Sequence, residues 1–280
     1  MDINAILKQN GYGERVNFAS IAKWAVARRE NFHSAADLLA AVAEEFGAVE
    51  KKIAMRERPA PYRLWLHPET PVDGNAIDQL KTALSLPVAV GGAGMPDLHK
   101  GYSLPIGGVV VLDHAISPAF VGYDISCMMM LTVLDTTGHS LPEDLEKEEV
   151  RQEYLAWVLT STSFGLGAET DGVEHPVMDS PVWGESRYLK GLKSLAGSQL
   201  GSSGAGNHFA DIVVGHGIEG ESFIGLLTHS GSRGAGNKIG HYYSDLADRY
   251  ASPKYKFPAG YGWFDLDSEP GQEYRHAMEL

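Results

Sequence analysis

Apolar residues at roughly helical spacing characterise the first part of the chain. They recur from Val16 to Ala25, and again along one predicted helix face from Leu38 to Phe46. Ser34 is placed to cap the second helix, and Gly47 is placed to end it. Prolines then interrupt the pattern, at Pro59, Pro61, Pro68 and Pro71. The pattern therefore predicts an N-terminal helical extension over residues 1–71.

The middle of the chain alternates between helical and strand-like patterns. A helix capped by Asp73 or Asn75 is predicted to run to Pro87. Short apolar runs predict strands, of which the first is buried and the other two are central, at Val88–Val90, Gly107–Leu112 and Met128–Leu134. Two further runs predict a pair of neighbouring strands, at Phe209–Val214 and Phe223–Leu227.

The remaining segments predict helices joined by Gly- and Pro-rich loops. Pro142 fits the first turn of a helix that extends through Val158. The other predicted elements are a loop over residues 165–186, a short helix at Tyr188–Leu195, a helix that begins near Asn237, and a strap over residues 251–280 whose terminal helix, after Glu269, is frayed. The pattern is that of one large mixed core that follows the helical extension.

Composition excludes several classes of protein. The chain has 280 residues, 44% of them hydrophobic and 21% charged, as in an ordinary globular protein. No apolar run approaches the roughly 20 residues of a membrane span, and the start lacks the pattern of a signal peptide. A single cysteine suits a reducing compartment, so a cytoplasmic protein is expected. The net charge of −13 argues against a general basic surface for nucleic acid.

Four side chains form a candidate metal site. Asp124 and Cys127 are three residues apart and precede a predicted strand. His208 and His229 each lie beside small, turn-forming residues next to a predicted strand. A carboxylate, a thiolate and two imidazoles suit zinc, manganese, iron or cobalt. From Cys127 alone, the alternative of a small buried apolar residue stays open.

Four sequence words carry a resemblance to a known family. They are MPDLHKG, VGYDISC, GAGNHF and HSGSRG, in this order between about Asn75 and Asp267. This pattern resembles the RtcB family of RNA-splicing ligases, which join a 2′,3′-cyclic phosphate or 3′-phosphate RNA end to a 5′-hydroxyl. The resemblance implies an α+β fold of packed, largely antiparallel or mixed sheets surrounded by helices. It places the metal-binding core in residues 72–280.

The resemblance also implies roles for individual residues. Asp124, Cys127, His208 and His229 match metal ligands of the family, which binds one or two Mn²⁺ ions and GTP; Zn²⁺ or Co²⁺ are alternatives. Asn207 matches a residue that contacts the nucleotide phosphate, and Arg233 an arginine that meets phosphate. Asp97 and His99 match the MPDxH word, where they would orient a ligand or meet the RNA end. Asp211 stands where the family commonly has Glu, an acid implicated in guanine recognition.

The chain also departs from the family pattern. The resemblance implies a further metal-binding histidine and a guanylylated histidine near the family's C-terminus. His241 and His276 are the only histidines after HSGSRG, and neither matches them. The expectation is an RtcB-like RNA ligase with an incomplete ligation cycle. The alternatives are a metal-dependent phosphoesterase, or a non-catalytic protein or fragment that binds metal or RNA ends.

Overall fold

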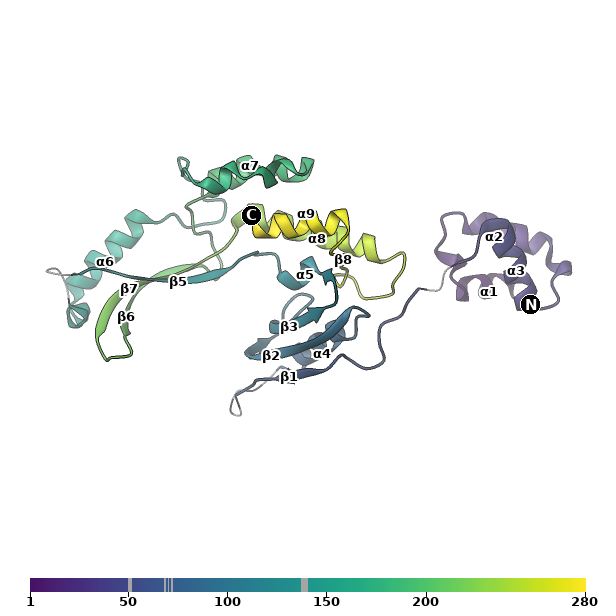
Figure 1. Ribbon diagram of the computed structural model, residues 1–280, viewed down its shortest axis with the longest axis horizontal. Helices are drawn as coiled ribbons and strands as arrows, with labels where there is room; N and C mark the ends of the chain where they lie inside the picture. The colour runs from purple at the N-terminus through teal and green to yellow at the C-terminus, as the bar shows by residue number, and fades with distance from the viewer. Residues whose placement is uncertain (50–51, 68, 70, 72, 137–140) are drawn as a thin grey trace. The chain divides into compact units, whose positions relative to one another are not determined.

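The chain forms two compact units. The computed structural model describes residues 1–49, 52–67, 69, 71, 73–136 and 141–280 (Figure 1). The smaller unit contains Met1–Arg56 and Ser252–Phe257, and the larger contains Glu57–Ala251 and Pro258–Leu280. The division predicted from the sequence, between a helical extension over residues 1–71 and a metal-binding core over residues 72–280, stays a prediction.

The smaller unit is a helical cluster around its own apolar core. Its helices are α1 (Ile3–Gln9), η1 (Tyr12–Glu14), α2 (Phe18–Ala27), η2 (Arg29–Asn31) and α3 (Ala35–Phe46). The Ser34 hydroxyl accepts the Asp37 N–H at 3.1 Å, and Gly47 ends α3 with a positive φ, as predicted. Leu7, Ile21 and Leu38 are fully buried in this core. Val16, predicted to share the apolar face of the helix, is instead fully exposed just before α2.

The larger unit combines short strands with longer helices. In chain order it contains β1 (Tyr62–Leu64), α4 (Gly74–Leu84), β2 (Ala89–His99), β3 (Ile106–Leu112), β4 (Ala115–Ile116), α5 (Pro118–Val121), β5 (Met128–Val133), η3 (Pro142–Glu146), α6 (Glu148–Ser161), η4 (Pro176–Asp179), η5 (Pro181–Gly184), α7 (Arg187–Gln199), β6 (Phe209–His216), β7 (Ser222–Ser230), α8 (Arg233–Ala251), β8 (Phe264–Asp265) and α9 (Glu269–Glu279). Across the described ranges, no helix has the length and apolar character that a membrane crossing requires.

The strands of the larger unit form small mixed and antiparallel sheets, which confirms the predicted α+β class. In the order β1-β2-β3, β1 is parallel and β3 antiparallel to β2, and α4 packs against β2 and β3. In the order β5-β7-β6, every pairing is antiparallel. A short β4-β8 pair joins the C-terminal segment to the core. The predicted pairing of the Phe209 and Phe223 segments is confirmed as β6 and β7.

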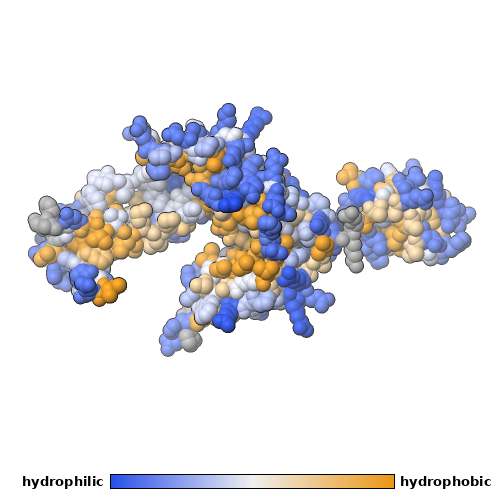
Figure 2. Space-filling view, in the orientation of Figure 1, coloured by the Kyte–Doolittle hydropathy of each residue, from blue (hydrophilic) through white to orange (hydrophobic). Residues whose placement is uncertain are grey.

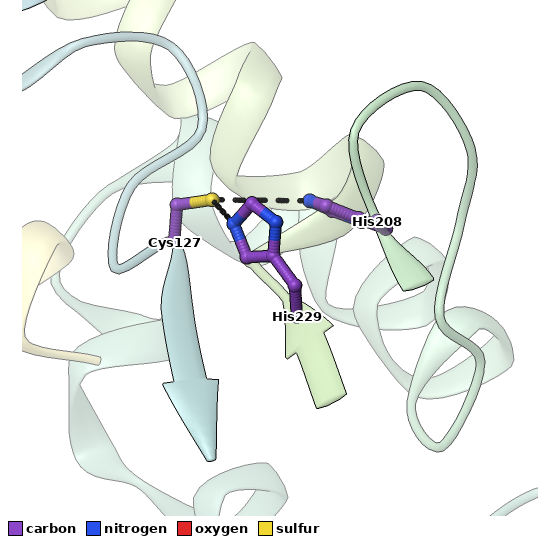
Figure 3. Close-up of side chains that lie close together, drawn as sticks. All are labelled: Cys127, His208 and His229. Atoms are coloured by element: carbon purple, nitrogen blue, oxygen red, sulfur yellow. Dashed lines mark hydrogen bonds between the residues drawn. The ribbon is translucent and has the colours of Figure 1, made fainter. Parts of the chain in front are cut away.

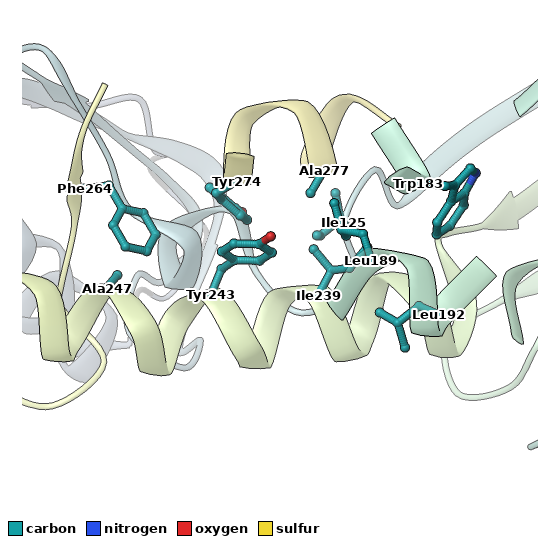
Figure 4. Close-up of a cluster of buried hydrophobic side chains, with 10 residues drawn as sticks. All are labelled: Ile125, Trp183, Leu189, Leu192, Ile239, Tyr243, Ala247, Phe264, Tyr274 and Ala277. Atoms are coloured by element: carbon teal, nitrogen blue, oxygen red, sulfur yellow. The ribbon is translucent and has the colours of Figure 1, made fainter. Parts of the chain in front are cut away.

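The main core lies along one face of α8. Ile239, Tyr243 and Ala247 recur at every fourth position and point into a cluster with residues of α7, η5, β8 and α9 (Figure 4). Ile125, from the loop before β5, belongs to the same cluster and is only 4% exposed. This core therefore fixes the backbone of the Asp124–Cys127 segment directly.

Two strand predictions are wrong. The predicted short strand at Val88–Val90 overlaps the start of a longer strand, β2, which runs from Ala89 to His99 and contains Asp97. Its pairing with β3 shifts register between Gly94 and His99, and this irregularity accommodates the Pro/Gly-rich sequence. The predicted central strands, β3 and β5, are both edge strands, and β5 is exposed along its whole length.

Three helix predictions also need correction. The helix predicted from Pro142 is divided into η3 and α6. Helix α8 begins at Arg233 and not near Asn237, because the Gln199 side chain and the Ser232 carbonyl accept the first N–H groups, those of Gly234 and Gly236. Helix α9 is not frayed, since Ser268 caps it and Tyr274 is fully buried.

Tyr274 gives a test of this core. Its hydroxyl is buried, and no partner for it is found among the described residues. A buried hydroxyl without a hydrogen bond costs roughly 1–3 kcal/mol. We expect Tyr274→Phe to leave the free energy of unfolding unchanged or to raise it by about 1 kcal/mol, as measured by urea denaturation. The matched control is Tyr243→Phe, which removes a hydroxyl that donates to the Glu273 carboxylate and should destabilise the protein. A clear loss of stability in Tyr274→Phe would show that its hydroxyl has a partner.

Candidate metal centre

A tight turn places Asp124 and Cys127 together before β5. The Cys127 N–H donates to the Asp124 carbonyl at 3.3 Å. Ser126, within the turn, has a φ of 58°, which a non-glycine residue adopts only where its surroundings enforce it. Burial of Ile125 in the core supplies that constraint, and the flanking Asp124 and Cys127 side chains reach the same group of histidines.

Two histidines from neighbouring strands meet the thiol. His229 lies near the end of β7, and His208 directly precedes β6 (Figure 3). His229 Nε2 is 2.7 Å from Cys127 Sγ, and His208 Nε2 is 4.0 Å from the same sulfur. One ligand atom from each of the three side chains lies within 4.8 Å of the others. The structure thus brings together residues that are up to 102 positions apart in the chain.

Backbone carbonyls fix the tautomer of both imidazoles. His208 Nδ1 lies 2.6 Å from the Ser203 carbonyl oxygen, and His229 Nδ1 lies 2.8 Å from that of Asn207. A carbonyl oxygen only accepts hydrogen bonds, so each Nδ1 carries a proton and donates it. In a neutral imidazole the lone pair is then on Nε2. Both lone pairs point to the space beside Cys127 Sγ, which is the arrangement of histidines that bind a metal.

Asp124 lies outside this group of three side chains but contacts one member of it, His208. Its Oδ2 is 2.8 Å from His208 Nε2, and its Oδ1 accepts the Ser232 N–H at 3.1 Å. Burial raises the pKa of the Asp124 carboxyl, but a hydrogen bond from His208 when its Nε2 is protonated, with hydrogen bonds from Cys127 and the Ser232 N–H, outweighs burial, so the net pKa is lowered. Gly231 lies against this carboxylate, and a Cβ atom there would overlap the Asp124 oxygens. The carboxylate is therefore ionised and held in one position.

The three grouped donors, with the Asp124 carboxylate beside His208, suit a divalent transition-metal ion. Burial, a hydrogen bond to Asp124 and the charge of Asp124 raise the pKa of the Cys127 thiol to about 11, so without a cation the thiol is protonated at neutral pH. With both Nδ1 protons donated to carbonyls, neutral His208 directs a lone pair at the Asp124 carboxylate, which is unfavourable unless a cation or a proton lies between them. Cys, His and carboxylate donors together favour zinc, manganese, iron or cobalt.

Arg233 and Asn207 lie at the border of the cluster. The Arg233 guanidinium donates to the Ser202 hydroxyl at 3.0 Å and to the Ala168 carbonyl at 3.3 Å, so it links the loops that flank the site. Its φ of 55° is a second positive value next to the ligands. Asn207 contributes its carbonyl to His229, and its residue surface is exposed. A phosphate-binding role for either side chain stays a prediction.

The other predicted site residues are Asp211, which lies on β6, and the pair Asp97 and His99, which lies on β2. Asp211 is exposed on β6. Phe209 pairs with His229 of β7, so these two residues share a face of the sheet. Asp211 lies two residues after Phe209 on the same strand and is therefore on that face too. Asp97 and His99 contact each other, with 3.6 Å between the His99 Nδ1 and Asp97 Oδ1 atoms. Within the described part of the chain, the group of possible metal ligands around Cys127 includes neither of them. Their predicted roles remain untested.

A cavity of about 660 Å³ adjoins the cluster. Its lining includes chain neighbours of the ligands, namely Ser126, Met128, Ser203 and Ser230. Apolar side chains such as Trp183 form one part of its wall, and hydroxyl groups with Arg233 form another. Such a mixture suits a ligand that has both an apolar and an anionic part.

Several residues that hold the ligands were not predicted from the sequence. They are Ser203 and Asn207 through their carbonyls, Gly231 and Ser232 beside Asp124, and Gln199 at the start of α8. Gly204 has a φ of 92°, and a Cβ atom there would overlap the Arg233 guanidinium. The Gly/Ser-rich composition of this loop was the one signal present, but composition does not show which carbonyl faces a histidine.

Comparison with known proteins identifies the family. The chain matches the family described as tRNA-splicing ligase RtcB over residues 79–175 and 181–280. It is 33% identical over 206 residues to the RNA-splicing ligase RtcB of Escherichia coli (strain K12), which covers 68% of this chain and 48% of that protein. It is 29% identical over 238 residues to the tRNA-splicing ligase RtcB of Thermococcus kodakarensis, covering 66% of this chain and 46% of that protein.

This chain belongs to the RtcB family, as its four sequence words predicted. It spans about half the length of the curated relatives that it matches. The matched segments include Asp124, Cys127, His208 and His229.

Proposed function

We propose that this chain forms the metal-binding part of an RNA-splicing ligase site. In this proposal Asp124, Cys127, His208 and His229 hold a divalent ion, Mn²⁺ by family resemblance, next to the phosphate at an RNA 3′ end. The observation that carries it is the convergence of two Nε2 atoms near Cys127 Sγ, that of His229 at 2.7 Å and that of His208 at 4.0 Å, with both Nδ1 atoms held by backbone carbonyls. A bound cation would neutralise phosphate oxygens and activate the attacking group.

The residues around the cluster supply the other functions in this proposal. The Arg233 guanidinium and the hydroxyls of Ser203 and Ser230, which line the cavity, bind the terminal phosphate. Asn207 and Asp211 contact GTP, the nucleotide that the family resemblance implies. Asp97 and His99 meet the RNA near its end. The chain has a net charge of −13 and no excess of basic residues that could hold RNA by a general positive surface. In this proposal the metal ion and Arg233 supply that positive charge locally.

RNA ends of defined chemistry test the proposal. With Mn²⁺ and GTP present, the protein should bind an RNA that ends in a 3′-phosphate on the order of tenfold or more tightly than the same RNA with a 3′-hydroxyl, because only the phosphate contacts metal and arginine. Fluorescence anisotropy measures this ratio. A 2′,3′-cyclic-phosphate RNA and a 5′-hydroxyl RNA are assayed in parallel for a joined product. Equal affinity for both ends, with no change in either RNA, would contradict the proposal.

A metal-dependent phosphoesterase is the second candidate function. The contacts that His241 and His276 make favour it. His241 stacks on the Tyr123 ring with 3.8 Å between ring centroids, and His276 pairs with Glu185 at 3.0 Å. Each imidazole is engaged with another side chain, and among the described residues neither belongs to the group of possible metal ligands around Cys127. Opening a cyclic phosphate requires only an activated water and phosphate contacts. In the same assay, conversion of the cyclic phosphate without a joined product would support this function.

A further inference from the structure

The smaller unit is positively charged, although the chain as a whole is acidic. Within Met1–Arg56 and Ser252–Phe257 the sequence has ten Lys and Arg residues against seven Asp and Glu residues, a net charge of +3 with His neutral. The larger unit has 13 against 29, a net charge of −16. Figure 2 shows hydrophilic residues interspersed with apolar ones on the visible surface of the smaller unit, whose helices α1, α2 and α3 are labelled in Figure 1. Only Ser252–Phe257 of this unit lies within the segments matched to the RtcB family, so the match assigns no role to the rest of it.

Three lysines of this unit lie on two paired segments. Ile53 and Tyr255 form a parallel bridge. The Ile53 N–H donates to the Lys254 carbonyl and the Lys256 N–H donates to the Ile53 carbonyl, both at 2.9 Å. Side chains of paired extended segments alternate between the two sides, so the residues that flank the bridged pair share one side. These residues include Lys52, Lys254 and Lys256, which together are called here the lysine face.

A carboxylate confirms that the lysines lie on the same side. Lys52 Nζ is 2.9 Å from Glu14 Oε2. A hydrogen bond from Lys52 and the positive charges of Lys52 and Lys256 lower the pKa of the Glu14 carboxyl, so Lys256 also lies near this carboxylate. All three lysines are exposed. One carboxylate against three ammonium groups leaves an excess of positive charge on the lysine face, which suits an anion with several charges.

Aromatic residues alternate with lysines in the second of these segments, which reads Lys254-Tyr255-Lys256-Phe257. Both aromatic residues are half-buried, and Lys254 Nζ lies 5.4 Å from the centroid of the Tyr255 ring. Proteins hold single-stranded nucleic acid with this combination, because bases stack on aromatic rings while basic groups contact the phosphates. An acidic polypeptide offers carboxylates but no bases to stack, so single-stranded RNA fits this surface better.

We propose that the lysine face binds the phosphate backbone of single-stranded RNA, through residues other than those of the candidate metal centre. This inference goes beyond the proposed function, which concerns the RNA end, and it rests on that function only in naming RNA as the polyanion. Contacts to phosphates position a nucleic acid without reading its bases. Binding by the lysine face is therefore independent of the RNA sequence and of the group at the RNA 3′ end.

The experiment measures how the full chain binds a single-stranded RNA that ends in a 3′-hydroxyl, with EDTA present so that no metal ion contributes. Fluorescence anisotropy gives the affinity at several salt concentrations. The double variant Lys254→Ala with Lys256→Ala should bind about tenfold more weakly at low salt, because two phosphate contacts are lost. The slope of log affinity against log salt concentration should fall in magnitude by about 1 to 2.

The matched control is the double variant Lys81→Ala with Lys190→Ala. These two lysines are exposed on α4 and α7 of the larger unit, so their removal gives the same net charge. The control should bind RNA as the wild type does. All four lysines are exposed, so neither double variant should unfold, and circular dichroism checks this.

Three outcomes would overturn the inference. They are the absence of RNA binding by the wild type in EDTA, equal affinities of the two double variants, and competition by polyglutamate that is as strong as competition by unlabelled RNA. The last outcome would identify an acidic polypeptide as the better occupant.

The proposed function is tested separately, by the ratio of affinities for 3′-phosphate and 3′-hydroxyl RNA in Mn²⁺ and GTP. The lysine variants should leave this ratio unchanged. A normal ratio without any effect of the lysine variants contradicts this inference alone and leaves the proposed function standing. An effect of the lysine variants without a preference for the 3′-phosphate contradicts the proposed function alone.

Discussion

Cys127→Ala is expected to lose about 100-fold or more in affinity for Mn²⁺ or Co²⁺, and His208→Ala is expected to do the same. Each change removes one of the three donors whose ligand atoms lie within 4.8 Å of one another, and the remaining donors would hold a cation less tightly. Isothermal titration measures the affinity. Co²⁺ provides a second measurement, because a cobalt–thiolate absorption band should be present in the wild type and absent in Cys127→Ala.

His216→Ala is the matched control for the histidine. His216 is the last residue of β6, at the end of the strand far from His208, and its Nδ1 contacts the Ser222 hydroxyl at 2.9 Å. Its replacement should leave the metal affinity unchanged. Binding by Cys127→Ala and His208→Ala that is as tight as in the wild type would show that this cluster does not hold the metal.

Gly231→Ala should impair metal binding without removing a ligand. The added methyl group would overlap the Asp124 carboxylate, which Ser232 and His208 hold in place. The carboxylate must then rotate away and give up both hydrogen bonds. We expect a loss of metal affinity of about 10- to 100-fold, in the range seen when groups that orient a ligand are altered. Titration with Mn²⁺ measures it.

Gly191→Ala is the control for this change. Gly191 lies within α7, and a Cβ atom there would have no neighbouring atom within 4 Å among the described residues, so alanine should keep the metal affinity and stabilise the helix by roughly 0.5–1 kcal/mol. If Gly231→Ala binds metal as tightly as Gly191→Ala does, then the position of Asp124 does not matter for the site.

The sequence predicted elements well where local chemistry decides them. The Ser34 and Asp73 caps, Gly47 at the end of α3, and the β6–β7 pairing all appear as predicted, because caps and strand alternation depend on nearby residues. The candidate ligands were proposed from their residue types and from the family words. The structure brings these side chains together, and their role as metal ligands stays a prediction.

The failures have a common physical cause. The exposure of β5 was not predicted, because an apolar run shows that a strand needs covering but not whether the chain covers it. The early start of α8 depends on Gln199, 35 residues away, which accepts the Gly234 N–H. The order of α9 depends on the burial of Tyr274 against residues of other elements. Each of these properties is set by distant contacts, which local patterns do not encode.

The carbonyl contacts of His208 and His229 determine which substitutions the orientation of these imidazoles tolerates. Both imidazoles are oriented by main-chain oxygen atoms, those of Ser203 and Asn207. Substitutions at these two positions change the side chain and keep the oxygen, provided that the loop keeps its path. The protonation pattern of the two imidazoles is therefore robust to mutation at the residues that enforce it. Substitutions of Gly204 or Gly206 would disturb this protonation pattern instead, because the positive φ values of these two glycines shape the loop that carries the carbonyls.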